Sequence, residues 1–291
     1  MPQPMHSARQ DVDGVRLRPL TAADLPSAVA LSEEVRWPHR LVDWQFAFEF
    51  GEGLVAERDG ELVGTALGWR WGRRHATIGL VIVDPRCQGR RVGYRLMEAL
   101  LADLPGRSVL LHATPDGRGL YERLGFVRTG EVRQHQGIAL PAPLVALEAG
   151  RRLRPIDQSD TAVLATLDAQ ARGMPRTALI TDLLGHSDTV VLDHDGQARG
   201  FAMSRRFGRG LVLGPVVAPD ADGAKALIAH LVGLNVGKFV RIDVDFASGL
   251  TEWLETLGLL RVDAPTVMVR GKVPSMTAGV QGFALVNQAL G

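Results

Sequence analysis

Cysteine is almost absent from this sequence, with Cys87 alone among 291 residues. A single cysteine excludes a disulfide within the chain and a zinc site built from several thiolates. Such a composition suits a reducing compartment, so we expect a cytoplasmic protein. The eight histidines are scattered and form no His-Glu-x-x-His pattern, so we expect no metal site.

Long apolar runs and an excess of one charge are also missing. No stretch approaches the roughly 20 uninterrupted apolar residues that a membrane-spanning helix needs. The first ten residues, MPQPMHSARQ, contain no apolar core, so we expect no secretory signal. The net charge is +1, whereas proteins that bind nucleic acids through phosphates usually carry a basic excess. The sequence therefore predicts neither a membrane nor a nucleic-acid partner.

What the sequence does contain is an internal repeat. Residues 16–20 (RLRPL), followed by Asp24, recur 136 positions later as residues 152–156 (RLRPI), followed by Asp160. The dipeptide Asp59-Gly60 recurs at the same offset as Asp195-Gly196. Fixed-period similarity indicates a repeated structural unit. We predict two copies of one fold, with domains at 1–145 and 146–291 joined near residues 141–151.

Each copy has the pattern of a mixed α/β fold with a mixed sheet. Apolar runs of strand length alternate with segments of helical spacing. Asp59-Gly60 lies between two apolar runs and is the dipeptide favoured in a tight hairpin turn. In the first copy we expect a strand at 15–17, a hairpin at 53–58 and 61–69, a buried strand at 77–83, a helix at 89–104, a strand at 108–112 and a helix at 118–124.

The segment that carries chemistry joins the buried strand to the helix after it. Backbone N–H groups at a helix start have no intrahelical acceptor, and the helix dipole adds positive charge there. Together they form a site for a diphosphate or another anion. Gly89 and Gly93 lack a Cβ and let the backbone approach phosphate oxygens closely, while Arg90 and Arg91 supply positive charge.

Residue by residue, this segment resembles the acetyl-CoA loop of the GCN5-related N-acetyltransferase (GNAT) family. The family pattern is Gln/Arg-x-x-Gly-x-Gly/Ala after a strand that ends in Val-x-Pro. Here Gln88 opens the pattern and Gly93 closes it, after Val83-Asp84-Pro85. Arg91 departs from the pattern, because it stands where the family usually has its first glycine.

A second motif, Leu120-Tyr121-Glu122-Arg123-Leu124-Gly125-Phe126, resembles the family's Leu-Tyr-x-x-x-Gly-Phe. The resemblance implies that Tyr121 lies near the CoA sulfur and is the catalytic general acid. A tyrosine with a pKa of about 10 is protonated at neutral pH and able to protonate a departing thiolate. The family's Asn-x-x-Ala lead-in is replaced by Thr114 and Gly117, so one CoA contact of the family is not expected here.

The resemblance implies acetyl-CoA as the co-substrate and no metal. It implies that one strand offers backbone groups to the pantetheine arm and that the following loop binds the diphosphate. The strand residues are Leu80, Val81, Ile82 and Val83, and the loop residues are Gln88, Gly89, Arg90, Arg91, Val92, Gly93 and Tyr94.

The second copy lacks both motifs. At the place of the loop it has residues 222–227 (DGAKAL), which put an acid at the entrance and Leu227 in place of the final glycine. Leu254 stands at the place of Tyr121. We therefore predict that the second domain keeps the fold, has lost the CoA site and helps to shape the acceptor pocket.

Several roles stay open from sequence alone. Trp37 and Trp44, with Phe46, either wall the acceptor site or pack in the core. His112 either relays a proton or is structural, and Glu33 and Glu34 either include the general base or face solvent.

The expected function is transfer of an acetyl group from acetyl-CoA to a small primary amine, by direct attack in a ternary complex. The alternatives are a non-catalytic acyl-CoA sensor and a protein-modifying acetyltransferase. Sequence leaves the oligomeric state and the acceptor open.

Overall fold

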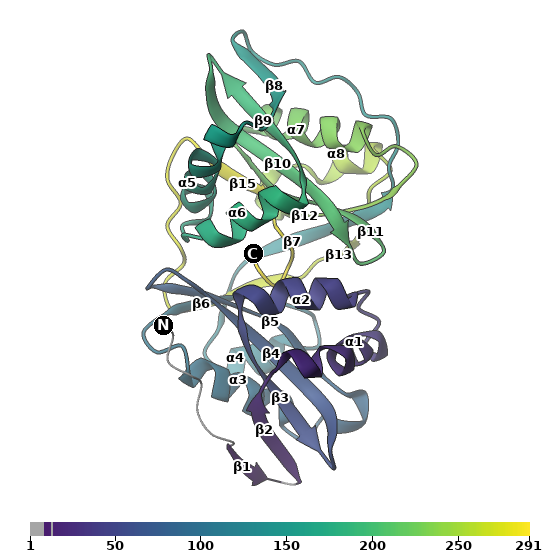
Figure 1. Cartoon of the computed structure of the whole chain (residues 1–291), viewed down its shortest axis with the longest axis vertical. Coiled ribbons are helices and arrows are strands. Elements are labelled where there is room, and N and C mark those ends of the chain that lie inside the picture. The colour runs from purple at the N-terminus through teal and green to yellow at the C-terminus, as the bar shows by residue number, and fades with distance from the viewer. Residues whose placement is uncertain (1–8, 13) are drawn as a thin grey trace.

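Two lobes are stacked along the long axis of the molecule, each built on a mixed sheet with packed helices (Figure 1). The computed structural model describes residues 9–12 and 14–291. Strands β4 and β5 are antiparallel while β5 and β6 are parallel, so the predicted mixed α/β class is confirmed. Within these described ranges, no helix has the length and apolar character needed to cross a bilayer.

The first lobe contains the cleft described below. Its sheet has the order β1-β2-β3-β4-β5-β6-β14-β7. The strands are β1 (Arg9–Val12), β2 (Val15–Pro19), β3 (Glu52–Arg58), β4 (Glu61–Trp71), β5 (His75–Val83), β6 (Ser108–Ala113), β7 (Val127–Ile138) and β14 (Thr266–Arg270). The helices are α1 (Leu25–Glu34), α2 (Leu41–Phe50), α3 (Val92–Ala102) and α4 (Arg118–Arg123).

The second lobe repeats this arrangement. Its sheet continues from β7 in the order β12-β15-β11-β10-β9-β8, and β13 pairs with β7 on the side away from β12. The strands are β8 (Arg151–Pro155), β9 (Asp188–His194), β10 (Gln197–Phe207), β11 (Gly210–Ala218), β12 (Phe239–Asp245), β13 (Leu260–Asp263) and β15 (Gln281–Ala284). The helices are α5 (Thr161–Arg172), α6 (Thr177–His186), α7 (Ala221–Gly233) and α8 (Thr251–Thr256).

The repeated RLRP segments have the same structural role in both lobes. Arg18 donates to both carboxylate oxygens of Asp24, at 2.7 and 2.8 Å, and ties the first strand to the helix start that follows. Arg154 makes the same pair of bonds to Asp160, at 2.6 and 2.8 Å. Bidentate arginine–carboxylate pairs are both strong and geometrically specific. The Arg18 guanidinium accordingly lowers the pKa of Asp24 to about 2.

The predicted hairpins are present with the expected turn geometry. Asp59 and Gly60 have φ values of 53° and 82°, and Asp195 and Gly196 have values of 52° and 80°. Positive φ at both central residues matches the right-handed twist of the flanking strands. The repeat read from the sequence therefore corresponds to a repeat in backbone geometry.

The two lobes exchange strands. Strand β14, from the C-terminal half of the chain, lies between β6 and β7 of the first lobe. In return, the second half of β7 lies between β12 and β13 of the second lobe. The boundary at residue 145 divides the sequence but not the two sheets, because the sheet of the first lobe includes residues 266–270. It therefore stays a prediction.

The lobes also share one apolar core. The face of the first sheet that carries α1 and α2 packs on the face of the second that carries α5 and α6. Trp44 and Trp69 of the first lobe belong to the same buried cluster as Ile180 and Phe201 of the second. This shared core holds the α1–α2 connection, which borders the cleft, against the second lobe.

Within this interface, His39 lies among aromatic rings from both lobes. Its ring packs edge-on against Trp37, Trp44 and Phe207, with centroids 5.5 to 6.4 Å apart. Its Nδ1 is buried and has no hydrogen-bond partner in the described structure. Burial, and then the charge of Arg241, lower the pKa of His39 to about 4 against the opposing effect of Asp43. His39 is therefore neutral at pH 7.

Replacing His39 with phenylalanine should reduce the loss of stability in mild acid. The unfolded chain, in which the pKa is about 6.5, binds the proton more readily than the folded chain. The stability contributed by neutral His39 is thus present above pH 6.5 and is lost as the pH falls towards 4. At pH 5 the loss relative to pH 7 is about 2 kcal/mol. Thermal melts at both pH values measure it, and an equal drop in Tm for His39→Phe and wild type would contradict the assignment.

Candidate active site

A cleft of about 990 Å³ opens in the first lobe where β5 and β6 diverge. The two strands pair in parallel only over residues 75–77 and 108–110. Beyond that point the β6 side of residues 80–83 has no strand partner among the described residues, so its backbone groups can pair with a ligand. Val81, Ile82 and Val83 line the cleft, together with residues of α3 and α4.

The predicted phosphate loop lines this cleft. Asp84 accepts a hydrogen bond from the Arg86 backbone and pairs with the Arg86 guanidinium, which lowers the pKa of the carboxyl. The negative charge of Asp84 is therefore already balanced by the positive charge of Arg86. Arg91 is the N-cap of α3, and its side chain makes no capping bond in the described structure. The first-turn N–H groups of α3 point outward without an intrahelical acceptor.

Arg91 has a left-handed backbone, with φ 59° and ψ 13°. Glycine adopts this conformation without strain, whereas other residues pay roughly 1–2 kcal/mol for it. The geometry explains physically why glycine is favoured at this position in the loop pattern. The Arg91 guanidinium lies over the Tyr94 ring, 5.0 Å from its centroid, and both residues line the cleft.

Gly93 lies in the first turn of α3 and lines the cleft. A Cβ added there would meet Leu120 and Val83 side chains at 3.4 Å, which is ordinary contact. Uncapped N–H groups, a glycine at the helix start and the side chains of Arg91 and Arg123 together fit a diphosphate. This part of the cleft can therefore hold the diphosphate of a CoA molecule.

The structure brings most of the predicted cofactor-binding residues to one surface. The cleft is lined by Val81, Ile82, Val83, Gln88, Gly89, Arg91, Val92, Gly93 and Tyr94. Two predicted residues do not line it. Arg90 is exposed. The Leu80 side chain is buried in the core on the opposite face of the sheet. The Leu80 carbonyl accepts a hydrogen bond from the Thr65 hydroxyl at 2.8 Å. Leu80 also has a positive φ of 51°, which marks a break in regular strand geometry at the start of the cleft.

Tyr121 lies on α4 and lines the same cleft. Its side chain is only 8% exposed and packs edge-on against Phe126, with ring centroids 6.0 Å apart. Burial raises the pKa of Tyr121 to about 12, because the charged phenolate is disfavoured away from water. The hydroxyl is thus protonated throughout the physiological range and is able to donate.

The cleft is also lined by Val35 and Trp37 from the α1–α2 connection. Trp44, the second tryptophan considered for this wall, is fully buried in the core and donates to the Ser32 hydroxyl at 3.0 Å. Phe46 is half-buried and packs against the shared core.

Glu33 and Glu34 are exposed at the end of α1 and do not line the cleft. Sequence reasoning did not identify Asp116 and Arg123 as part of the cleft; only their proximity to Tyr121 along the chain pointed to them.

In the second lobe the corresponding place is occupied by a strand. Strand β15 pairs with both β11 and β12 and fills the gap that the β5–β6 divergence leaves open in the first lobe. Asp220 caps α7 by accepting from the Gly223 backbone at 2.8 Å, and it also pairs with Arg151. A helix start that already holds a carboxylate repels a second anion. Both observations support the predicted loss of the CoA site in this domain.

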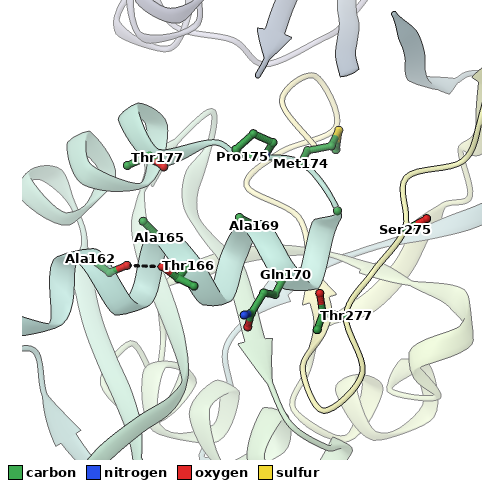
Figure 2. Close-up of a pocket in the computed structure, with 11 residues that line it drawn as sticks. Ala162, Ala165, Thr166, Ala169, Gln170, Met174, Pro175, Thr177, Ser275 and Thr277 are labelled. Carbon is green, nitrogen blue, oxygen red and sulfur yellow. Dashed lines mark hydrogen bonds between the residues drawn. The ribbon is translucent and has the colours of Figure 1, made fainter. Parts of the chain in front are cut away.

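A hollow of about 430 Å³ does lie elsewhere on the second lobe, between α5, the start of α6 and the segment after β14 (Figure 2). Its lining contains no titratable side chain. Thr166 turns back to its own helix and donates to the Ala162 carbonyl at 2.9 Å (Figure 2). Over residues 9–12 and 14–291, no group of three or more His, Cys, Asp or Glu side chains is placed as metal ligands would be.

Comparisons with known proteins agree with this geometry. A profile described as "Acetyltransferase (GNAT) family" matches residues 20–126, and one described as "Acetyltransferase (GNAT) domain" matches residues 164–284. The chain is 30% identical over 222 residues to the uncharacterized N-acetyltransferase YitH of Bacillus subtilis, covering 75% of this chain and 77% of that protein.

Solved structures show the same two-lobed fold. A putative acetyltransferase from Pyrococcus horikoshii superposes with a TM-score of 0.77 at 19% identity, over 98% of this chain and 99% of the other. A tandem GNAT protein from the clavulanic acid biosynthesis pathway gives 0.65 at 16% identity, over 89% and 99%. With matching profiles in both halves, the chain belongs to the GNAT acetyltransferase family as a tandem-domain enzyme.

Proposed function

We propose that this enzyme transfers an acetyl group from acetyl-CoA to a small-molecule primary amine through the cleft of its first domain. The observation that carries the proposal is one cleft that is lined both by the uncapped start of α3 and by Trp37. Tyr121 lines the same cleft. Acetyl-CoA supplies the acetyl thioester when bound.

The chain's residues have distinct tasks in this proposal. The loop at residues 88–94 binds the diphosphate, and the strand at residues 81–83 aligns the pantetheine arm by backbone pairing. The amine nitrogen attacks the thioester carbonyl carbon, and the C–S bond breaks. Tyr121 then donates its proton to the departing sulfur, and the loss of that donor is expected to be costly.

A small acceptor is supported by what packs behind Trp37. Trp37 packs against His39, which in turn packs against Phe207 of the second domain. The backbone of Gly208 in the same hairpin donates to Asp43 of α2 at 3.0 Å. The second domain thus backs the Trp37 wall of the cleft, and this supported wall favours a small acceptor in the proposal.

Release of CoA over a panel of amines tests the proposal. Wild type should turn over at least one small amine, and Gly93→Glu should turn over none of them. Tight acetyl-CoA binding without turnover of any amine or peptide would instead identify an acyl-CoA sensor. Turnover restricted to peptides would identify a protein-modifying enzyme.

A further inference from the structure

The cleft of the first domain is bordered by side chains from both faces of its sheet. Successive side chains of a strand point to opposite faces, and the end of β5 follows this rule. Val81 and Val83 pack with the core that contains α3, whereas Ile82 belongs to the core shared with the second lobe. All three line the cleft, at the place where β5 and β6 no longer pair. The cleft thus connects the two faces of the sheet.

Val35 and Trp37 line the cleft on the face opposite to α3. Both side chains pack against the shared core, which contains residues of α1, α2 and the second lobe. Val92 of α3 and Tyr121 of α4 also line the cleft, but they belong to the core on the α3 face. A CoA molecule anchored at the start of α3 and a ligand at Trp37 would therefore meet from opposite faces of the sheet.

The indole of Trp37 is available to such a ligand. The other tryptophans of the first lobe each donate their indole N–H to a protein acceptor at 2.8 to 3.0 Å; they are Trp44, Trp69 and Trp71. Trp37 is only half-buried, and its indole N–H has no acceptor in the part of the chain that the structure describes. Its ring and its N–H can therefore contact a molecule in the cleft.

The second domain supports this indole through His39. The His39 ring packs edge-on against Trp37, with centroids 5.9 Å apart, and against Phe207 of the second domain, with centroids 5.5 Å apart. The next residue, Gly208, approaches the α1–α2 connection so closely that an added Cβ would stand 3.0 Å from the Pro38 carbonyl oxygen. The position of Trp37 therefore depends on a ring of the first domain that the second domain contacts directly.

The charges in the cleft indicate which chemical groups the acceptor lacks. The lining includes two guanidinium groups, those of Arg91 and Arg123, and one carboxylate, that of Asp116. In the proposed function both guanidinium groups bind the diphosphate. The side chains that line the cleft from the α1–α2 connection are uncharged. An acceptor carboxylate beside Trp37 would lose its water without gaining a cation, whereas an apolar group loses nothing by leaving water.

We propose that the acceptor is a primary amine that carries an aromatic ring and no carboxylate. Trp37 determines this preference, and Phe207 of the second domain is the positioning residue that acts on Trp37 through His39. The inference rests on the proposed acetyl transfer and names the class of its acceptor. An aromatic ring packed on an indole gains more than its buried area alone supplies, which corresponds to about 2–12-fold in affinity over an aliphatic ring.

A set of related amines tests the acceptor class in the full-length enzyme. The kcat/KM for 2-phenylethylamine should exceed that for phenylalanine, which adds only a carboxylate, by at least about 100-fold. Phenylalaninamide, in which an uncharged amide replaces the carboxylate, should recover most of this difference. 2-Cyclohexylethylamine, whose ring is not flat, should lie about 2–12-fold below 2-phenylethylamine. A kcat/KM for phenylalanine equal to that for 2-phenylethylamine, or turnover of amines without an aromatic ring alone, would overturn the proposed class.

Trp37→Ala should raise the KM for 2-phenylethylamine about 10–50-fold and leave the KM for acetyl-CoA within about threefold. Trp37→Phe keeps an aromatic wall, so its amine KM should stay within about fivefold of wild type. Trp253→Ala is the matched control. Trp253 is also a half-buried tryptophan, but it packs against the core of the second domain and does not line the cleft. Its two KM values should match wild type, and an unchanged amine KM in Trp37→Ala would remove Trp37 from acceptor recognition.

Phe207→Leu separates positioning from a general loss of stability. Leucine keeps an apolar side chain but removes the ring that packs against His39, so the KM for 2-phenylethylamine should rise about three- to tenfold. In the Trp37→Ala background the same substitution should have no further effect on this KM, because Phe207 acts only through Trp37. A purely structural residue would lower Tm in both backgrounds without this dependence. Independent, additive effects on the amine KM would overturn the role of Phe207.

A binding measurement separates this inference from the proposed function. Calorimetry with 2-phenylethylamine compares wild type and Trp37→Ala, each saturated with CoA, and wild type should bind at least tenfold more tightly. If wild type acetylates amines but neither KM nor binding depends on Trp37, only this inference fails. If 2-phenylethylamine binds in a Trp37-dependent way but no amine is acetylated, the proposed transfer fails and the recognition inferred here stands.

Discussion

Tyr121→Phe should lower kcat by about 10²–10⁴-fold while leaving the affinity for acetyl-CoA within about threefold of wild type. The substitution removes only the hydroxyl. The ring keeps its edge-on contact with Phe126 and its place in the core between α3, α4 and the sheet. The cleft therefore keeps its shape, and the loss falls on the step in which sulfur leaves.

CoA release under saturating substrates measures this effect, and calorimetry with acetyl-CoA measures binding. Because burial raises the pKa of Tyr121 to about 12, the donor stays protonated far above neutral pH. The wild-type kcat/KM for acetyl-CoA, at saturating amine, should therefore show no loss from Tyr121 up to pH 10. Full activity of Tyr121→Phe would remove Tyr121 from the mechanism and leave the cleft itself unaffected.

Gly93→Glu should weaken acetyl-CoA binding at least 100-fold. The new carboxylate would stand at the start of α3, beside the position proposed for the diphosphate. Two unit charges 4 Å apart repel by about 4 kcal/mol at an effective dielectric constant of 20, which corresponds to more than a hundredfold in affinity. The uncapped N–H groups of the helix would also be satisfied by the protein's own carboxylate rather than by the ligand.

Two further glycine variants separate charge from size and from a general loss of stability. At Gly93 an alanine Cβ would make ordinary contacts at 3.4 Å, so Gly93→Ala should bind acetyl-CoA within a few-fold of wild type. Gly185 lies on the exposed side of α6, where an added Cβ meets nothing within 4 Å, so Gly185→Glu should bind normally. Calorimetry on all three variants decides. Equal affinity of Gly93→Glu and wild type would show that this loop does not bind the diphosphate.

Local features of the fold were predictable because each depends on residues close in sequence. Asp59-Gly60 specifies a turn with positive φ at both positions, and the structure has that turn. The helix expected at 89–104 forms as α3, Val92–Ala102, and residues 89–91 belong instead to the turn between the short 3-10 helix at Pro85–Cys87 and α3. The motif around Tyr121 likewise forms a short helix, with the tyrosine facing the cleft.

Non-local features were not predictable from the sequence, for a physical reason. An edge of β6 can pair with any strand of compatible pattern. Residues 108–113 carry no signal that specifies β14, about 150 positions away, as the partner. The contact of His112 with Gln288 depends on the same long-range arrangement, so sequence left the role of His112 open. Arg91 is an intermediate case, because its departure from the loop pattern was visible but its left-handed backbone was not.

The exchange of strands between the lobes limits which parts of the chain can be lost in evolution. If the polypeptide were cut at residue 145, the facing edges of β6 and β7 would lose β14, and the unpaired backbone groups would favour aggregation. The second domain can therefore lack a CoA site, as predicted from its sequence, yet it cannot be removed without exposing these edges. Because the two copies are fused in one chain, every cleft in a first domain has a second domain beside it. The polypeptide thus behaves like a dimer whose halves cannot dissociate.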